Sequence, residues 1–381
     1  MSDVGVEYVE LGLRLGRHQD GLVDSYYGPA EIKERVDAEE LRDPAALVQD
    51  AASLLAQAAD DWVAAQLLGL QTVARRLAGE EVSYEDEVER CYGVRPEWVP
   101  EESFEAAHRE LDEALLGNGS LAERYQAWRE GDGLQGDALA AVFNGLAEDF
   151  RARTKALFEL PEGESIEVDY VSDEPWTAFN YYLGGLRSRI AVNTDVPMTP
   201  DIVTHLVAHE CYPGHHTEHA WKEQLHVREG RLEESALMVG TPSSLISEGI
   251  AELAPEIMLG GEVEQVIAAH VEGTGVAYDP ELSRTVKAAR LPLGYVGGNV
   301  ALLIHTRGGS KEEAIEYSMR WGLTTRRRAE QTVRFVTDPV WRSYVSTYTA
   351  GEDLCRPWVA GDPARFRRLL TEQLTPADLA D

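Results

Sequence analysis

The chain has 381 residues and a formal net charge of −32, from 67 acidic and 35 basic side chains. This negative field repels nucleic acid and anionic membranes, so neither is an expected partner. Hydrophobic residues make up 44% of the chain, but no run approaches the roughly 18 apolar residues of a membrane span. Because the N-terminal segment lacks the basic and apolar regions of a signal peptide, we expect a cytoplasmic protein.

Residues 1–155 are predicted to be helical throughout. Alanine and leucine recur with helical spacing from 45 to 78, with interruptions near Asp60 and at Gly69. Two further helices are predicted at 102–116 and 137–160, where apolar residues return at the helical period. We interpret this part of the chain as a helical scaffold that forms one wall of a cleft.

After residue 160 the pattern changes from helix to strand. Residues 165–171, SIEVDYV, alternate apolar and polar positions. The runs TAFNYYL and LRSRIAVN then flank Gly184 and Gly185, and a Gly-Gly connector between strand-like runs is typical of a hairpin. The sequence therefore predicts a small antiparallel sheet.

A helix with a clear start follows this sheet. Thr199 is a favourable N-cap and Pro200 a favourable first residue, and apolar residues between 202 and 207 form a buried stripe. His209 and Glu210 then fall in the third turn.

A second helix is predicted at 245–259, where Pro255 should end or kink it. Glu248 and Glu252 are four residues apart and share one face of this helix. Glu252 either holds a ligand histidine or faces solvent, and both interpretations stay open. From residue 279 onward the chain is again predicted to be helical.

Histidines concentrate at the end of the first of these two helices. Six of the ten lie between residues 205 and 226, and residues 209–221 read HECYPGHHTEHAW. Imidazoles beside carboxylates are the ligand types of zinc sites. The common HExxH signature is absent, however, because position 213 is proline.

One ligand arrangement depends on a broken helix. On a continuous helix, His209 and His215 would be about 240° apart in rotation and about 9 Å apart in rise. Pro213 and Gly214 provide a break between them, since proline removes an N–H and glycine accepts unusual dihedral angles. Both histidines would then reach one metal.

A second arrangement is the inverted spacing HxxEH, formed by His215, Glu218 and His219. A third pairing, His205 with His209, also has the spacing of one helical turn but leaves the role of Glu210 unexplained. The residues alone do not choose among these sets.

The string HECYPGHH, followed by SEGIAE at residues 247–252, resembles the HExxPGH bacterial family catalogued as domain of unknown function 885, usually grouped with gluzincin-type metallopeptidases. The match covers residues 165–355 best. The resemblance implies a zinc set and a general base: His209, His215 and Glu248 as ligands, and Glu210 as the base. The sequence departs from the family at Ile250, where a large aromatic residue is usual.

The resemblance implies a mainly α-helical, gluzincin-like fold with a small antiparallel sheet beside the active-site helix. Residues 1–155 would be the scaffold region and 156–381 the catalytic metallohydrolase region, packed around one cleft. We expect Zn²⁺-dependent hydrolysis of a peptide substrate, by an exopeptidase or oligopeptidase. The alternatives are an inverted-motif zinc peptidase and a non-catalytic binding protein on a degenerate peptidase scaffold.

Two further groups of residues have expected roles at the site. Besides the metal, the reaction needs a donor that stabilises the oxyanion. The first choice is Tyr348, which lies in a YxxG setting similar to a late family motif. Weaker candidates are Tyr295, His305 and Arg334. In the gluzincin layout a strand edge beside the metal helix pairs with extended peptide. The residues expected to line that edge are Asn180, Tyr181, Tyr182 and Asn193.

Overall fold

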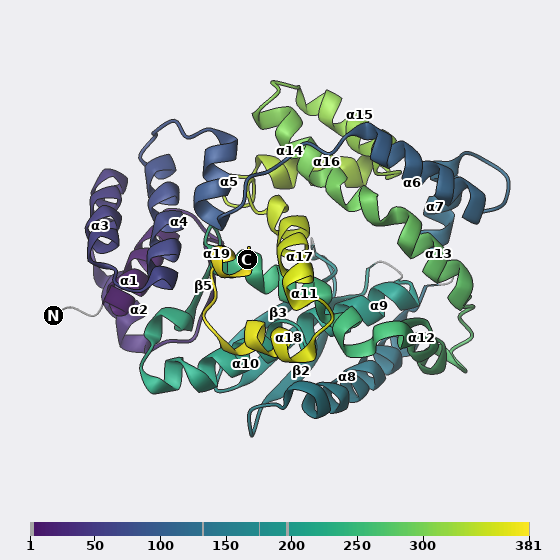
Figure 1. Ribbon diagram of the computed structural model, residues 1–381, viewed down its shortest axis with the longest axis horizontal. Helices are drawn as coiled ribbons and strands as arrows, with labels where there is room; N and C mark the ends of the chain where they lie inside the picture. Colours follow the sequence, from purple (N-terminus) through teal and green to yellow (C-terminus); the bar gives the residue numbers. More distant parts are fainter. Residues whose placement is uncertain (1–3, 132, 175, 196–197, 381) are drawn as a thin grey trace.

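The computed structural model describes residues 4–131, 133–174, 176–195 and 198–380. Figure 1 shows the N-terminal helices on one side and the helices of residues 101–130 and 280–337 on another. Two helices, α11 (Pro242–Leu259) and α17 (Val345–Val359), run through the middle of the molecule. The molecule is mainly α-helical with small sheets, as predicted.

The first part of the chain contains these helices: α1 (Val4–Gly16), α2 (Ala30–Ala38), α3 (Pro44–Gln57), α4 (Asp61–Leu77), α5 (Tyr84–Tyr92), α6 (Glu101–Ala114), α7 (Leu121–Glu130) and α8 (Gly136–Phe158). The first predicted interruption lies between α3 and α4. There the Asp60 side chain accepts hydrogen bonds from the backbone N–H groups of Trp62 and Val63 and caps α4. Helix α4 continues through Gly69, so the second predicted interruption is wrong. Gly69 instead lets the helix pack closely on Gly240.

The prediction of an entirely helical first region is wrong at one point. Strand β1 (Val23–Tyr26) pairs in antiparallel fashion with β5 (Ala236–Met238). The partner strand is more than 200 residues away in the sequence, so no local pattern marked β1 as a strand. The pairing ties the start of the chain to the segment that leads into α11.

A mixed sheet precedes helix α9 (Pro200–Leu206) and the histidine-rich segment. Strands β3 (Ala178–Gly184) and β4 (Arg187–Asn193) form the predicted antiparallel hairpin, and β2 (Ser165–Val171) joins β4 in parallel, giving the order β2-β4-β3. The prediction of an antiparallel sheet therefore holds for the hairpin, while β2 runs parallel because its connection to β4 passes through β3. Strand β3 is the edge that lies beside the histidine-rich segment.

The helix predicted from Thr199 is divided into several turns. Helix α9 (Pro200–Leu206) continues into a π-helical turn (Val207–Cys211), and α10 (His215–Leu225) begins after a break. Thr199 caps α9 through a hydrogen bond from the backbone N–H of Ile202. Short 3₁₀ turns at Val227–Glu229 and Leu232–Ser235 lead from α10 to β5.

Helices α11 and α17 pack closely through glycines. A Cβ at Gly249 would lie 2.5 Å from the carbonyl oxygen of Gly351, and a Cβ at Gly351 would lie 2.4 Å from that of Leu245. Any larger side chain would push the two helices apart. Helix α11 ends at Leu259, as predicted, and continues through Pro255, so of the two effects expected of this proline the end of the helix is excluded.

From residue 279 onward the chain is helical, as predicted, with a 3₁₀ turn at Leu291–Tyr295 and helices α13 (Pro280–Arg290), α14 (Val296–His305), α15 (Lys311–Trp321), α16 (Arg326–Thr337), α18 (Pro363–Thr371) and α19 (Pro376–Leu379). The 3₁₀ turn at Gly260–Glu262 and helix α12 (Val263–Val271) were not predicted. One large hydrophobic cluster joins buried residues between 8 and 104 to others between 236 and 336. A second cluster joins residues between 134 and 158 to others between 190 and 379. Both predicted regions thus contribute to each core.

Candidate metal centre

Three side chains from separate elements, one of them α11, converge at one place in the structure. His209 comes from the π-helical turn, His215 is the first residue of α10, and Glu248 lies in α11. His209 Nε2 lies 3.1 Å from His215 Nε2 and 3.6 Å from Glu248 Oε2, and His215 Nε2 lies 3.8 Å from Glu248 Oε1. The structure thus brings together the set that the broken-helix arrangement requires.

The break between the two histidines depends on Gly214. The Tyr212–Pro213 peptide is cis, and the chain turns back on itself here. A Cβ at Gly214 would lie 1.9 Å from the carbonyl oxygen of His209, so only glycine fits. The close backbone contact places His215 beside His209 although six residues separate them.

His215 is held from its other ring nitrogen. Its Nδ1 lies 3.1 Å from Ser247 Oγ, and the Ser247 hydroxyl donates to Glu218 Oε2. Glu218 also accepts a 2.7 Å hydrogen bond from Lys222 Nζ. A serine hydroxyl has one proton, so Ser247 must accept from His215 Nδ1–H. This fixes the tautomer and leaves the lone pair of Nε2 facing His209 and Glu248.

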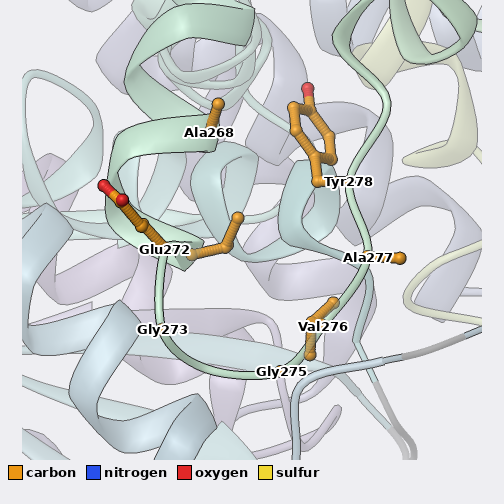
Figure 2. Close-up of a pocket in the computed structure, with 8 residues that line it drawn as sticks. Ala268, Glu272, Gly273, Gly275, Val276, Ala277 and Tyr278 are labelled. Carbon is orange, nitrogen blue, oxygen red and sulfur yellow. The ribbon is translucent and has the colours of Figure 1, made fainter.

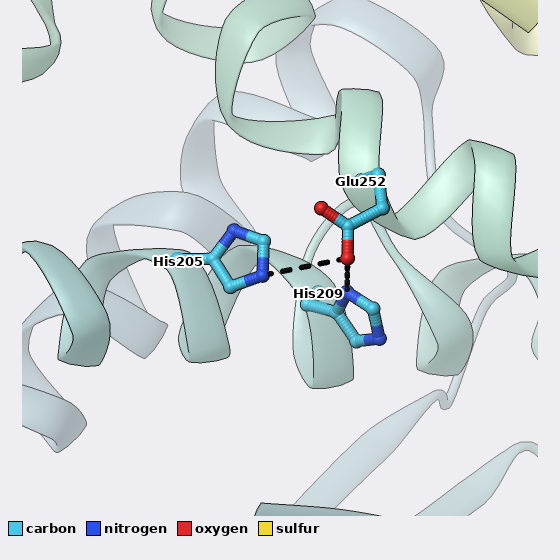
Figure 3. Close-up of side chains that lie close together, drawn as sticks. All are labelled: His205, His209 and Glu252. Atoms are coloured by element: carbon cyan, nitrogen blue, oxygen red, sulfur yellow. Dashed lines mark ion pairs between the residues drawn. The ribbon is translucent and has the colours of Figure 1, made fainter. Parts of the chain in front are cut away.

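His209 is likewise approached on its far side. Its Nδ1 lies 3.6 Å from Glu252 Oε1, which also lies 3.8 Å from His205 Nε2. Figure 3 shows the Glu252 carboxylate between the two imidazole rings. This separation is longer than a hydrogen bond, and His209 Nδ1 is buried without a hydrogen-bond partner in the described structure. Glu252 therefore faces His209 and His205, not solvent alone.

Glu248 has a partner of its own. The hydroxyl of Tyr344, just before α17, donates a 2.6 Å hydrogen bond to Glu248 Oε1. The other oxygen, Oε2, is buried and has no hydrogen-bond partner. Burial raises the pKa of Glu248 well above its usual value, although the bond from Tyr344 opposes this.

These contacts show that the three residues suit a divalent cation. The two Nε2 atoms lie 3.1 Å apart, where one imidazole donates to the other without a metal; when both rings are protonated at Nδ1, both Nε2 lone pairs can bind one cation. Glu248 Oε2 adds a buried acceptor without a donor. Burial lowers the pKa of both histidines, and neutral imidazole is the form that binds metal.

Glu210 is buried beside this group. Its backbone carbonyl accepts a 2.6 Å hydrogen bond from Asn180 Nδ2 on β3. Burial, and then the charge of Asp24, raise the pKa of the Glu210 carboxyl to about 8. A carboxyl with such a pKa exchanges protons near neutral pH, as a general base requires.

Tyr348 lies one helical turn beyond Tyr344, with ring centroids 5.6 Å apart. It keeps 39% of its surface exposed, and burial followed by the charges of Glu248 and Glu252 raises the pKa of its hydroxyl. No hydrogen bond involves this hydroxyl within the described residues, so it is available to a ligand.

The weaker candidates for oxyanion donor are engaged elsewhere or point to solvent. Tyr295 donates to Asp353, and His305 contacts the Val336 carbonyl oxygen. Arg334 is exposed on α16. None of them is among the neighbours of the three converging side chains.

The inverted set does not converge in the same way. His215 and His219 stack with ring centroids 6.1 Å apart, but both oxygens of Glu218 are held by Ser247 and Lys222. Over the described ranges, the groups whose ligand atoms lie within 4.8 Å of one another are His209, His215 and Glu248, and His205, His209 and Glu252.

Of the residues expected along the strand edge, Asn180 donates a hydrogen bond to the π-helical turn that carries His209 and Glu210. Tyr181 stacks on the Arg189 guanidinium, and the Tyr182 hydroxyl donates to Glu223. Asn193 lies on the central strand β4 and donates to the carbonyl oxygens of Glu174 and Trp176. The last three therefore have structural contacts.

Sequence patterns did not identify Ser247 or Tyr344 as site residues. Ser247 directly precedes Glu248 in the SEGIAE string, and Tyr344 lies one turn before Tyr348, so both were within reach of a spacing argument.

A separate pocket of about 580 Å³ lies in the connection between α12 and α13 (Figure 2). Glu272 and Tyr278 lie on opposite sides of it, with the Glu272 carboxylate pointing away from the Tyr278 ring, and the other lining residues are small or apolar. The Tyr278 hydroxyl is bonded to Asp201. The lining includes none of the converging histidines, so we place no chemistry there.

No protein-family model and no curated protein matches this chain. Membership of the HExxPGH family therefore stays a prediction. A solved structure with a similar fold is the putative lipoprotein from Colwellia psychrerythraea, with a TM-score of 0.56 and 17% identity over 92% of this chain. This chain spans 64% of the length of that protein.

Two carboxypeptidases have weaker likenesses. The Pyrococcus furiosus carboxypeptidase has a TM-score of 0.40 and 14% identity, covering 98% of this chain and 90% of its own. Trypanosoma cruzi metallocarboxypeptidase 1 has a TM-score of 0.41 and 15% identity, covering 99% and 89%. These scores are too low to establish a shared fold.

Among the described helices, none is both long and apolar enough to cross a membrane.

Proposed function

We propose that the protein is a zinc-dependent peptidase with His209, His215 and Glu248 as metal ligands. The observation that carries this proposal is the pair of opposed Nε2 atoms, 3.1 Å apart, with a buried and unpaired carboxylate oxygen beside them. Two of the ligands are hydrogen-bonded to another side chain, His215 to Ser247 and Glu248 to Tyr344, and the Glu252 carboxylate lies 3.6 Å from His209 Nδ1. Such outer partners are typical of functional metal sites.

A divalent cation held there would lower the pKa of a water molecule and polarise a substrate carbonyl. Glu210 then acts as the general base: it takes the proton of the attacking water and delivers it to the leaving amine. The free hydroxyl of Tyr348 donates to the oxygen that gains negative charge in the tetrahedral transition state. Asn180 positions the Glu210 backbone from the neighbouring strand edge.

We propose a peptide as substrate, with an exopeptidase or oligopeptidase preferred. His209, Glu210 and Glu248 are at most 8% exposed, so we infer that an extended chain reaches them more readily than a folded protein does. The edge strand β3 offers main-chain groups next to the site for such a chain.

The test combines metal analysis with peptide hydrolysis. Wild type, His209→Ala, His215→Ala and Glu248→Ala are purified without added metal, with His219→Ala as the control. We expect close to one zinc per chain in wild type and in His219→Ala, and loss in the other three. Loss in His219→Ala with retention in His209→Ala would move the site to the inverted motif, and no zinc in any of them would refute the proposal.

Glu210→Gln separates catalysis from binding. It should keep the metal and lose hydrolysis of a peptide library by about 10²-fold or more, as expected for removal of a general base. Metal retained in wild type without hydrolysis of any peptide would favour the non-catalytic alternative. Loss of hydrolysis in Glu218→Gln but not in Glu210→Gln would favour the inverted-motif peptidase.

A further inference from the structure

A second group of side chains lies on the Nδ1 side of His209. It consists of His205 in the last turn of α9, His209 in the π-helical turn and Glu252 in α11. Glu252 Oε1 lies 3.8 Å from His205 Nε2 and 3.6 Å from His209 Nδ1, as the dashed lines in Figure 3 show. The ligand atoms of all three lie within 4.8 Å of one another. We call this group the outer set, and His209, His215 and Glu248 the inner set.

The neighbour of His209 decides which of its ring nitrogens carries the proton when the inner set holds no cation. His215 is protonated on Nδ1, because the Ser247 hydroxyl accepts there. His215 Nε2 is therefore an acceptor, and at 3.1 Å it receives the proton of His209 Nε2–H. A neutral imidazole has one N–H, so the lone pair of His209 is on Nδ1. His209 then presents this lone pair to the outer set.

This lone pair has no donor in the protein. His209 is 8% exposed, and its Nδ1 is buried without a hydrogen-bond partner in the described structure. The atom nearest to it in the outer set, Glu252 Oε1, is also an acceptor. His205 Nε2 is 3.8 Å from that oxygen, too far to donate a hydrogen bond to it. Two acceptors that face each other at a buried place are costly unless a cation or a donor lies between them.

The outer set has the composition and spacing of a zinc site. Two imidazoles and a carboxylate are zinc ligands, and ligand atoms of a tetrahedral zinc site lie about 3.4 Å apart. The separations of 3.6 and 3.8 Å therefore need only small side-chain movements. The side chains of His205 and Glu252 are 40% and 24% exposed, against 13% and 7% for His215 and Glu248. The outer set is thus the more open of the two to solvent.

We propose that the outer set is a second site for a divalent cation, zinc or a metal with similar ligand preference, and that it is an alternative to the inner set. A cation on His209 Nδ1 leaves the proton on Nε2, so the inner set lacks one ligand. A cation in the inner set requires the proton on Nδ1, which removes the lone pair from the outer set. The chain therefore holds one cation in either of two positions. This inference goes beyond the peptidase function, but the exclusion of the inner set rests on the metal ligands proposed above.

The experiment measures zinc binding by calorimetry on the full chain after treatment with a chelator. Wild type is compared with Glu248→Ala, which disables only the inner set, and with Glu248→Ala combined with His205→Ala, which disables both. The matched control combines Glu248→Ala with His270→Ala, because His270 also lies beside a carboxylate, 3.4 Å from Asp149, but belongs to neither set. Circular dichroism checks the fold of each variant. If Glu248→Ala does not fold, the same series is made on a His215→Ala background, which also leaves the outer set complete.

We expect one zinc per chain in wild type, and one zinc bound about 10-fold or more weakly in Glu248→Ala and in the His270→Ala control, since a lost ligand weakens binding at least as much as a lost outer partner does. The combination with His205→Ala should lose this weaker binding. A site of this affinity empties during purification without added metal, in agreement with the expected zinc content of Glu248→Ala.

The other outcomes separate this inference from the peptidase proposal. Zinc binding by Glu248→Ala that His205→Ala leaves unchanged, or no zinc binding by folded Glu248→Ala, overturns the inference and leaves the peptidase proposal intact. Two zinc ions per wild-type chain also overturn it, because His209 would then serve both sets at once. Equal affinity in wild type and Glu248→Ala, lost with His205→Ala, supports the outer site but refutes the inner set and with it the peptidase proposal.

Discussion

Replacing Ser247 by alanine tests whether the contact behind His215 matters for metal binding. The change removes the acceptor of His215 Nδ1–H and the donor to Glu218 Oε2. It adds no bulk, so the packing of α11 should survive. Without Ser247, His215 is free to adopt the other tautomer, whose protonated Nε2 cannot bind a metal.

The structure sets the expected size of this effect. A buried carboxylate oxygen loses its donor, which costs about 1–3 kcal/mol. Removal of an outer partner of a metal ligand typically weakens metal binding about 10- to 100-fold, and each factor of ten corresponds to about 1.4 kcal/mol. We therefore expect the Kd for zinc to rise about 10- to 100-fold in Ser247→Ala.

The assay is a competition titration for zinc against a chromophoric chelator, with the thermal unfolding of the metal-free protein measured in parallel. Ser243→Ala is the matched control, because this serine lies one turn earlier on α11 and its hydroxyl contacts only Thr241 in the described structure. Zinc binding by Ser247→Ala as tight as wild type would refute the reasoning. An equal loss in Ser243→Ala would show that general damage to α11, and not the contact with His215, is the cause.

Three further predictions concern other parts of the chain. Gly214→Ala should abolish metal binding or folding, because the added Cβ would lie 1.9 Å from the His209 carbonyl oxygen. Zinc binding like that of wild type would contradict the helix break between His209 and His215. Tyr348→Phe should lower kcat about 10²- to 10³-fold with unchanged zinc content, whereas an unchanged kcat would exclude it as the oxyanion donor. Burial raises the pKa of Glu264, but hydrogen bonds from the backbone and from Lys287 outweigh it, and the pKa is lowered below 4.5. The ionised Glu264 side chain therefore stabilises the folded protein above that pH, and this stabilisation is lost as the pH falls further. The unfolding free energy of Glu264→Gln, from urea titrations at several pH values, should therefore fall less steeply in acid than that of wild type; parallel curves would count against this.

The sequence by itself determined the local features of the fold. The cap at Asp60, the helix start at Thr199 and the hairpin around Gly184 depend on residues within a few positions of each other, and each is present in the structure. The break between His209 and His215 was also readable, because proline and glycine limit the backbone locally. The choice among the histidine pairings was not, because it depends on which side chains of α11 face the break.

Contacts between distant segments were decided only by the tertiary structure. Strand β1 forms because β5 pairs with it, and the register shift between Val23 and Ser25 exists only in that pairing. The parallel addition of β2 follows from the path of the chain through the sheet. The persistence of α11 beyond Pro255 coincides with its burial against its neighbours, which override local preference.

The same distinction applies to the site. The ligand types were visible in the HECYPGHH string, since imidazole and carboxylate groups are identified by residue name alone. Their contacts with Ser247, Glu252 and Tyr344 were not visible, because contacts between side chains from different elements require those elements to be packed first. The sequence thus determined which chemical groups are present. The packing of α10, α11 and the start of α17 decided which of these groups meet, because only a folded core brings distant side chains within bonding distance.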